Sequence, residues 1–181
     1  MDVAELISKD LFRYTGGGKF WLAYFMYPGF KYTFYFRIIQ WLRSYKKTSL
    51  SPLVLLFKIR LLSLQRYYGI QIPLSVQIGE GFYIGHFGTI VVNGAVKIGK
   101  NVNISQGVTI GKSNRGCKEG CPVIGNEVYI APGAKIIGKI FIGNNVAIGA
   151  NAVVTEDIPD NACVAGIPVS IQKWHLDKIL P

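Results

Sequence analysis

Cysteine is scarce in this chain: only three occur among 181 residues, at Cys117, Cys121 and Cys163. Three is an odd number, and too few for the disulfide frameworks that hold small secreted domains together. The first residues, MDVAELISKDLFRY, lack a basic segment followed by an apolar run, so they do not resemble a secretory signal. We therefore expect a reducing, cytoplasmic location.

Acidic residues are also few, and none occurs between Asp10 and Glu80. Residues 1–68 contain eleven Lys or Arg against three Asp or Glu, a net charge of +8. Residues 69–181 contain nine against seven, a net charge of +2. The first third is thus where a polyanion would bind, whether a nucleic acid, an anionic lipid or a phosphorylated lipid intermediate.

Long apolar runs are missing as well. Within residues 1–68, the longest stretches without a charge are residues 20–30 and 48–57, which are eleven and ten residues long. A membrane-spanning helix needs about 18 residues or more, so we expect no span. A basic helix rich in Trp and Tyr can instead lie in the membrane interface. The alternative, which the sequence leaves open, is that these apolar faces pack on the rest of the chain or on sister subunits.

The pattern of residues 1–68 is typical of a helical region. Pro28 and Gly29 interrupt its first segment. After this break, apolar side chains gather on one face of a predicted helix and polar ones on the opposite face. The apolar face contains Phe34, Ile38, Trp41, Leu42 and Tyr45, and the polar face contains Thr33, Arg37, Gln40, Ser44 and Lys47. A second helix is predicted to begin at Ser51 and Pro52, a capping residue followed by a proline suited to the first turn.

Residues 70–169 repeat with a period of six. The large aliphatic residues of this repeat are Ile72, Ile78, Ile84, Ile90, Ile98, Ile104, Ile110, Ile124, Ile130, Ile136, Ile142, Ile148 and Val154. The spacing departs from six twice: it is eight from Ile90 to Ile98 and fourteen from Ile110 to Ile124. A short fixed period predicts a solenoid, and a hexapeptide period predicts a parallel β-helix with three hexads in each triangular coil.

These hexads, many beginning with Ile-Gly, resemble the left-handed β-helix of the hexapeptide-repeat acyltransferases. The segments ISQGVTIG and VAGIPVS resemble serine acetyltransferases, and CPVIGN resembles their relatives, the colanic-acid and capsular polysaccharide O-acetyltransferases. The resemblance implies a mainly β fold, a left-handed parallel β-helix preceded by an α-helical N-terminal region. We expect a basic, aromatic helical region over 1–68, a catalytic β-helix over 69–169 with a loop at 111–123, and a tail over 170–181.

The resemblance assigns the general base to His86, the only histidine of the repeat region. Acyl transfer from a thioester to an alcohol needs a base that works near neutral pH, and imidazole is such a base. It also needs a donor for the oxyanion, for which we expect a backbone N–H at the glycine-rich coil edge. No serine or cysteine nucleophile is required, because the hydroxyl can attack acetyl-CoA directly. His175 is expected to be a tail residue without a catalytic role.

Several positions depart from the serine acetyltransferase pattern. Gln71 stands where the family has an aspartate that orients the histidine, so it can hydrogen-bond the imidazole but cannot stabilise its positive charge. Gly85 replaces an aspartate, and Gly120 with Cys121 replaces an Arg-His pair. In the family these charged groups hold the amino acid. We therefore expect the acceptor to be a sugar hydroxyl of a capsular or exopolysaccharide glycan or its precursor, with serine as the alternative.

The resemblance also implies the binding residues. The acceptor is expected to contact Gly85, Asn114, Arg115 and Cys121. Acetyl-CoA, the acetyl donor, is expected to contact Gly111, Lys112, Ala131, Ala165, Gly166 and Lys173. No metal is expected, because the Cys117–Cys121 pair supplies too few ligands for zinc.

The expected assembly is a homotrimer, since three chains of this family associate about a threefold axis with active sites between neighbours. The basic N-terminal region is expected to allow peripheral contact with an anionic membrane or a lipid-linked intermediate. No nucleic-acid partner is expected, although a non-catalytic scaffold or nucleic-acid binder that uses the basic segment is a third hypothesis.

Overall fold

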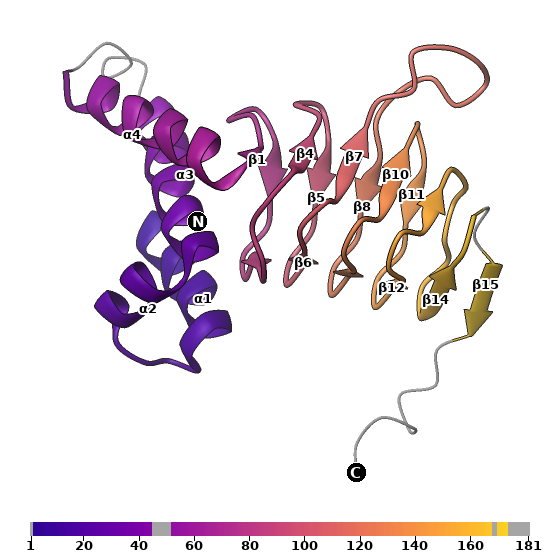
Figure 1. Ribbon diagram of the computed structural model, residues 1–181, viewed down its shortest axis with the longest axis horizontal. Helices are drawn as coiled ribbons and strands as arrows, with labels where there is room; N and C mark the ends of the chain where they lie inside the picture. Colours follow the sequence, from indigo (N-terminus) through magenta and orange to yellow (C-terminus); the bar gives the residue numbers. More distant parts are fainter. Residues whose placement is uncertain (1, 45–51, 168–169, 174–181) are drawn as a thin grey trace.

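The computed structural model describes residues 2–44, 52–167 and 170–173. This part begins with four helices, which stand together at one end of a row of short strands (Figure 1). The helices are α1 (Val3–Thr15), α2 (Phe20–Met26), α3 (Pro28–Ser44) and α4 (Pro52–Tyr68). The break at Pro28 and the start of the second predicted helix at Pro52 are confirmed; Ser51 lies outside the described residues.

The strands form three sheets, and consecutive strands over residues 70–154 belong to sheets A, B and C in turn. Sheet A contains β1 (Ile70–Gln71), β4 (Ile90–Val92), β7 (Thr109–Gly111), β10 (Lys135–Ile137) and β13 (Val153–Val154). Sheet B contains β2 (Gln77–Ile78), β5 (Lys97–Ile98), β8 (Val123–Ile124) and β11 (Phe141–Ile142). Sheet C contains β3 (Tyr83–Ile84), β6 (Asn103–Ile104), β9 (Tyr129–Ile130), β12 (Ala147–Ile148), β14 (Ala162–Ala165) and β15 (Ser170–Lys173).

Among the described strands, all neighbours pair in parallel except β14 and β15, which are antiparallel. The predicted fold class, a left-handed parallel β-helix after an α-helical region, is confirmed. The predicted tail, 170–181, begins as a strand of sheet C, because residues 170–173 pair with 162–165.

The interior of the β-helix is built from two residues in each hexad. The predicted aliphatic positions are all buried except Ile78, which is half-buried. The residue two positions earlier is buried too, as Val102 is before Ile104 and Val146 is before Ile148. Residues two apart on a strand point to the same face, so each strand contributes a pair of side chains to the core.

The register corrects the position of the first interruption. Ile110 of β7 aligns with Val92 of β4, and Ile90 aligns with Ile70. Val92, rather than Ile90, is therefore the repeat residue of this coil, and it follows Ile84 by eight positions. The two extra residues lie in the turn between Ile84 and Val92. Sequence spacing could not separate the two choices, because Ile90 and Val92 are both buried aliphatics on the same face.

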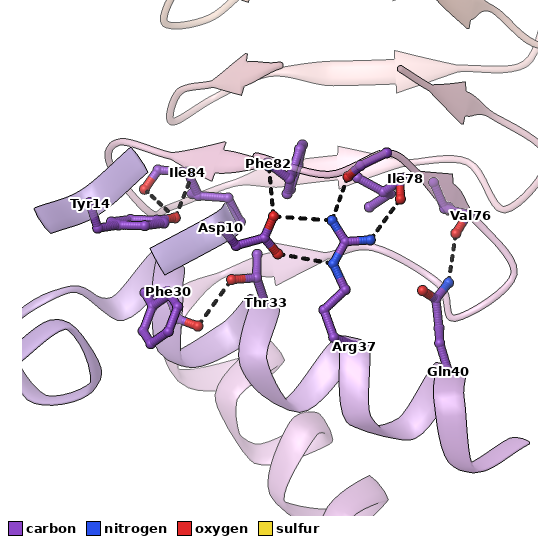
Figure 2. A network of polar contacts seen from close by, with 11 residues as sticks. Asp10, Tyr14, Phe30, Thr33, Arg37, Gln40, Val76, Ile78, Phe82 and Ile84 are labelled. Carbon is purple, nitrogen blue, oxygen red and sulfur yellow. Dashed lines mark hydrogen bonds and ion pairs between the residues drawn. The ribbon is translucent and has the colours of Figure 1, made fainter. Parts of the chain in front are cut away.

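Helix α3 closes the open end of the β-helix with its polar face. Gln40 Nε2 donates to the carbonyls of Leu74 and Val76 at 3.1 and 2.8 Å. Arg37 donates from Nη1 to the carbonyl of Ile78 at 2.6 Å and from Nη2 to that of Gly79 at 2.5 Å (Figure 2). The first coil has no preceding coil to pair with, so these side chains satisfy its carbonyl groups.

The predicted polar face is therefore partly buried, and the predicted apolar face is partly exposed. Thr33 and Arg37 of the predicted polar face are buried, whereas Trp41 of the predicted apolar face is 40% exposed. Amphipathic patterning assigns polar faces to water, but here the polar face meets unpaired backbone groups. Tyr45 and Lys47, which belonged to the same prediction, lie outside the described residues.

A column of glycines follows the strands of sheet B: Gly79, Gly99, Gly125 and Gly143. A Cβ on Gly125 would lie 2.6 Å from the carbonyl oxygen of Gly143 and 2.9 Å from that of Ile142. Both contacts are with backbone, so an added side chain cannot be accommodated by a rotamer change. The Ile-Gly signature is therefore a requirement of close coil stacking at this corner.

We expect Gly125→Ala to reduce the free energy of unfolding by about 1–3 kcal/mol through overpacking. The matched control is Gly85→Ala, at the equivalent position after sheet C, where the nearest atom to an added Cβ is a Tyr83 ring carbon at 3.2 Å. Chemical denaturation of both variants measures the difference. Equal losses would contradict the assignment of the cost to backbone contact.

Candidate active site

His86 lies in the widened turn between β3 and β4, and its side chain is exposed. The turn is held on both sides. The Gly107 N–H donates to the Gly88 carbonyl at 2.8 Å, and the Phe87 ring lies 5.0 Å from that of Tyr68 at the end of α4. The position where the repeat is interrupted is thus a fixed turn that presents a histidine to solvent.

Just before this turn, helix α1 braces the strand that leads into it. The Ile84 N–H donates to the Tyr14 hydroxyl at 2.8 Å, and burial raises the pKa of Tyr14 well above its ordinary value. Tyr14 therefore stays neutral and keeps its hydroxyl available for this bond.

The three sheets give the β-helix the shape of a triangular prism. Small residues line the edge of this prism on which His86 lies. The register of sheet C aligns Ile84, Ile104, Ile130, Ile148 and Val164. The residues that directly follow these are Gly85, Ser105, Ala131, Gly149 and Ala165. His86 and Gly166 occupy the next position at the two ends of the same edge. We call the series from Gly85 to Ala165 the small-residue edge.

The small-residue edge brings together residues that are far apart in sequence. It aligns the predicted base, His86, with the predicted coenzyme contacts Ala131, Ala165 and Gly166. Four steps of about 4.8 Å between neighbouring strands give it a length of roughly 19 Å. An edge without large side chains allows an extended ligand to lie close to the backbone along this length.

Gln106 is a residue that sequence reasoning missed. It occupies the same register position as His86, one coil further along, because Ile84 pairs with Ile104. Its Oε1 is buried and has no hydrogen-bond partner in the part of the chain that the structure describes. An unsatisfied buried amide oxygen costs about 1–3 kcal/mol, so a donor on a bound molecule would be favourable there. The register, which the sequence does not give directly, is the signal that finds this residue.

Gln71 belongs to sheet A and not to the turn that holds His86. It ends β1, its side chain is exposed, and it is paired in register with Val91 of β4, the strand that follows the His86 turn. Its role as the residue that orients His86 stays a prediction.

Gly85 precedes His86, and its N–H donates to the Ile104 carbonyl at 3.1 Å. This N–H is therefore engaged in coil stacking and cannot stabilise an oxyanion, so the expected donor has to be a different N–H. The predicted role of Gly85, contact with the acceptor, stays a prediction.

The loop at 111–123 is a hairpin that leaves the prism between β7 and β8 (Figure 1). Ser113 and Gly120 bond each other across it, N–H to carbonyl, at 2.9 and 3.0 Å. At its base the Cys121 thiol donates to Asn93 Oδ1 at 3.3 Å. The Lys118 ammonium donates to the Thr155 carbonyl at 2.9 Å, which ties the hairpin to a later coil.

The loop and His86 lie at different corners of one chain. The loop joins sheet A to sheet B, whereas His86 joins sheet C to sheet A. Within a single chain, the predicted binding residues of this loop therefore do not lie beside His86. These residues are Gly111, Lys112, Asn114, Arg115 and Cys121. Asn114 and Arg115 are exposed, and the Lys112 ammonium lies 3.9 Å from the Glu119 carboxylate.

The remaining predicted residues lie at the far end of the β-helix. Ala165 ends β14 and pairs in register with Ser170, and Lys173 ends β15 opposite Ala162. Cys117, Cys121 and Cys163 are free thiols. Within the described ranges, no three His, Cys, Asp or Glu side chains are grouped so as to hold a metal ion.

Comparison with known proteins gives a consistent set of relatives, although no protein-family model matches the chain. It is 34% identical to a serine acetyltransferase of Synechococcus elongatus over 142 residues, 78% of this chain and 56% of that protein. A solved serine acetyltransferase in complex with CoA has a TM-score of 0.73 and 30% identity, covering 94% of this chain and 68% of that one. The serine acetyltransferase of Vibrio cholerae has a TM-score of 0.77 and 26% identity, covering 97% and 68%. The chain spans about half the length of the curated relatives it matches.

Proposed function

This chain belongs to the serine acetyltransferase family of hexapeptide-repeat acetyltransferases, and from that premise we propose that it transfers an acetyl group from acetyl-CoA to a hydroxyl. The observation that carries this proposal is the small-residue edge. One end of the edge has a solvent-exposed histidine and the other has Ala165 and Gly166. An extended thioester with its acetyl group at His86 fits an edge of this length. A solved relative with the same fold was obtained in complex with CoA.

In the proposed mechanism His86 acts as a general base. Its neutral imidazole removes the proton of the acceptor hydroxyl as the oxygen attacks the thioester carbonyl. The tetrahedral oxyanion then collapses, the C–S bond breaks, and the thiolate receives the proton from the imidazolium. The acetyl group never bonds to the protein, so no nucleophilic side chain is consumed.

Serine is the acceptor that the relatives favour, since the proteins compared above are named for it. A sugar hydroxyl is the second candidate, favoured by the residues of the His86 turn. Residues 85–89 read GHFGT and carry no carboxylate to receive an amino acid's ammonium group. Cys121 likewise supplies no positive charge for a carboxylate.

We also propose that the site is completed by a neighbouring chain in a homotrimer. The supporting observation is that His86 and the 111–123 hairpin lie at opposite sides of sheet A. Packing chains about a threefold axis can place the hairpin of one chain beside the His86 edge of the next. Analytical ultracentrifugation of the full chain tests this directly, and a monomer at assay concentration would contradict it.

The acceptor is tested by product identification. The full chain is incubated with acetyl-CoA and one candidate acceptor at a time: L-serine, a simple hexose or a nucleotide sugar. The products are identified by mass spectrometry. O-acetylserine as the dominant product supports serine, whereas an acetylated sugar with unmodified serine supports the second candidate. Absence of any acetylated product with protein that binds CoA would contradict both.

A further inference from the structure

Helices α2 and α4 turn large apolar side chains to solvent. On α2 these are 54–69% exposed: Trp21, Leu22, Phe25 and Met26. On α4 they are 51–63% exposed: Leu53, Leu55, Leu56, Ile59 and Leu62. We call these nine residues the outer helix face. Isolated exposed apolar residues are ordinary, but a gathering of this kind marks an interaction surface.

A row of aromatic rings joins the two helices. Tyr24 of α2 and Phe57 of α4 flank Tyr35 of α3, with ring centroids 6.4 and 5.6 Å from that of Tyr35. The hydroxyls of Tyr24 and Tyr35 are 2.8 Å apart. The two apolar stretches are therefore held against the same side of α3 in a fixed arrangement.

Cations lie beside this surface. Residues 11–79 contain ten Lys or Arg and no Asp or Glu. Arg60 and Arg66 are exposed on α4 among the apolar residues. The Lys31 ammonium lies 5.0 Å from the centroid of the Tyr24 ring and 5.8 Å from that of Phe25. The face thus combines apolar and aromatic side chains with cations, and it lacks anions.

We propose that the outer helix face docks on an anionic lipid surface, with α2 and α4 lying in the membrane interface. Tryptophan and other apolar side chains favour the headgroup boundary, and nearby cations are attracted to anionic headgroups. No helix in the described part of the chain is long and apolar enough to cross a membrane, so the contact is peripheral.

Charge favours lipid over a second copy of this chain as the occupant. A second copy placed face to face would bring the cations Lys31, Arg60 and Arg66 of both copies together without an acidic residue between them, at the cost of like-charge repulsion. An anionic lipid surface supplies the opposite charge across the whole face.

The test is co-sedimentation of the full chain with vesicles of phosphatidylglycerol mixed with phosphatidylcholine, compared with phosphatidylcholine alone. We expect binding only to the anionic vesicles and loss of most of it at about 1 M NaCl, where the Debye length falls to about 3 Å. Arg60→Glu/Arg66→Glu is expected to bind at least about 30-fold more weakly, since each cation near the surface contributes about fivefold. Trp21→Ala/Phe25→Ala tests the apolar part and is expected to lower binding at unchanged net charge.

The matched control is Lys97→Glu/Lys139→Glu, which makes the same change in charge on exposed positions of the β-helix. It is expected to bind within about twofold of the wild type. Equal binding to neutral vesicles, no binding to anionic ones, or equal losses in both charge variants would overturn the proposal. So would a change of assembly mass in the helix variants without any vesicle binding, because a second copy would then cover the face.

Discussion

His86→Ala is expected to lower kcat/KM by about 10²–10⁴-fold, the range that general-base catalysis supplies. The side chain is exposed in a turn whose position is held by the backbone of the next coil and by Tyr68, so its removal should leave the fold unchanged. The loss should appear in kcat with little change in the affinity for acetyl-CoA, because the histidine acts on the acceptor hydroxyl. Steady-state thiol release measures both quantities.

The control for this variant is His175→Ala, since His175 is the other histidine of the chain and lies outside the described residues. It is expected to retain the wild-type rate. A His86→Ala protein of normal assembly that keeps more than about a tenth of the activity is incompatible with the mechanism, because general-base catalysis contributes at least about 10²-fold.

The Arg37→Met substitution is expected to cost about 3–5 kcal/mol of unfolding free energy, because it leaves the Asp10 carboxylate buried without its partner. Both side chains are almost fully buried, at 2% and 1% exposed. Arg37 Nε donates to Asp10 Oδ2 at 2.9 Å, and Asp10 Oδ1 also accepts the Phe82 N–H at 2.9 Å (Figure 2). The substitution also removes the donors to Ile78 and Gly79, so the cap on the first coil is lost with the ion pair.

The unfolding free energy lost in Arg37→Met should depend on pH in a defined direction. Burial raises the pKa of Asp10 above its ordinary value, while Arg37 opposes this rise. Without Arg37 the pKa of Asp10 in the folded state rises further above its value in the unfolded state. The Arg37→Met protein is therefore relatively most stable below the unfolded-state pKa of Asp10. It loses stability as pH rises through the folded-state pKa. The difference from wild type should therefore be smaller near about pH 4 than near about pH 8.

Two further proteins test this explanation by chemical denaturation. Arg43→Met removes an exposed arginine from the same helix and is expected to cost less than about 0.5 kcal/mol. Asp10→Asn/Arg37→Met removes both charges and should recover part of the loss, but not all of it, since the coil carbonyls stay unpaired. An Arg37→Met protein as stable as Arg43→Met would refute the capping role.

Much of the β-helix could be predicted from the sequence because its period is short and its anchors are chemically uniform. The exact coil register could not, since Ile90 and Val92 are interchangeable as buried aliphatics and only strand pairing distinguishes them. The amphipathic pattern of α3 also did not predict which of its residues are buried. The rule that polar faces meet water fails where Arg37 and Gln40 meet the unpaired carbonyls of a coil end.

The candidate site, too, could be predicted only in part. His86 and the small residues at 85, 131 and 165 could be found from the family resemblance. Their alignment along one edge required the register of sheet C. Gln106 and the separation of the loop from His86 also required it, because distance along the chain does not say which corner a residue occupies.

The most direct test of the central claim is the fate of radiolabelled acetyl groups from acetyl-CoA, followed in the full-length chain with L-serine and with candidate sugars. We predict that label appears as an ester on an acceptor, with one CoA thiol released per acetyl group transferred and none bound to the protein. Label that stays on CoA with every acceptor, in protein that binds acetyl-CoA, would contradict the assignment of this chain as an O-acetyltransferase.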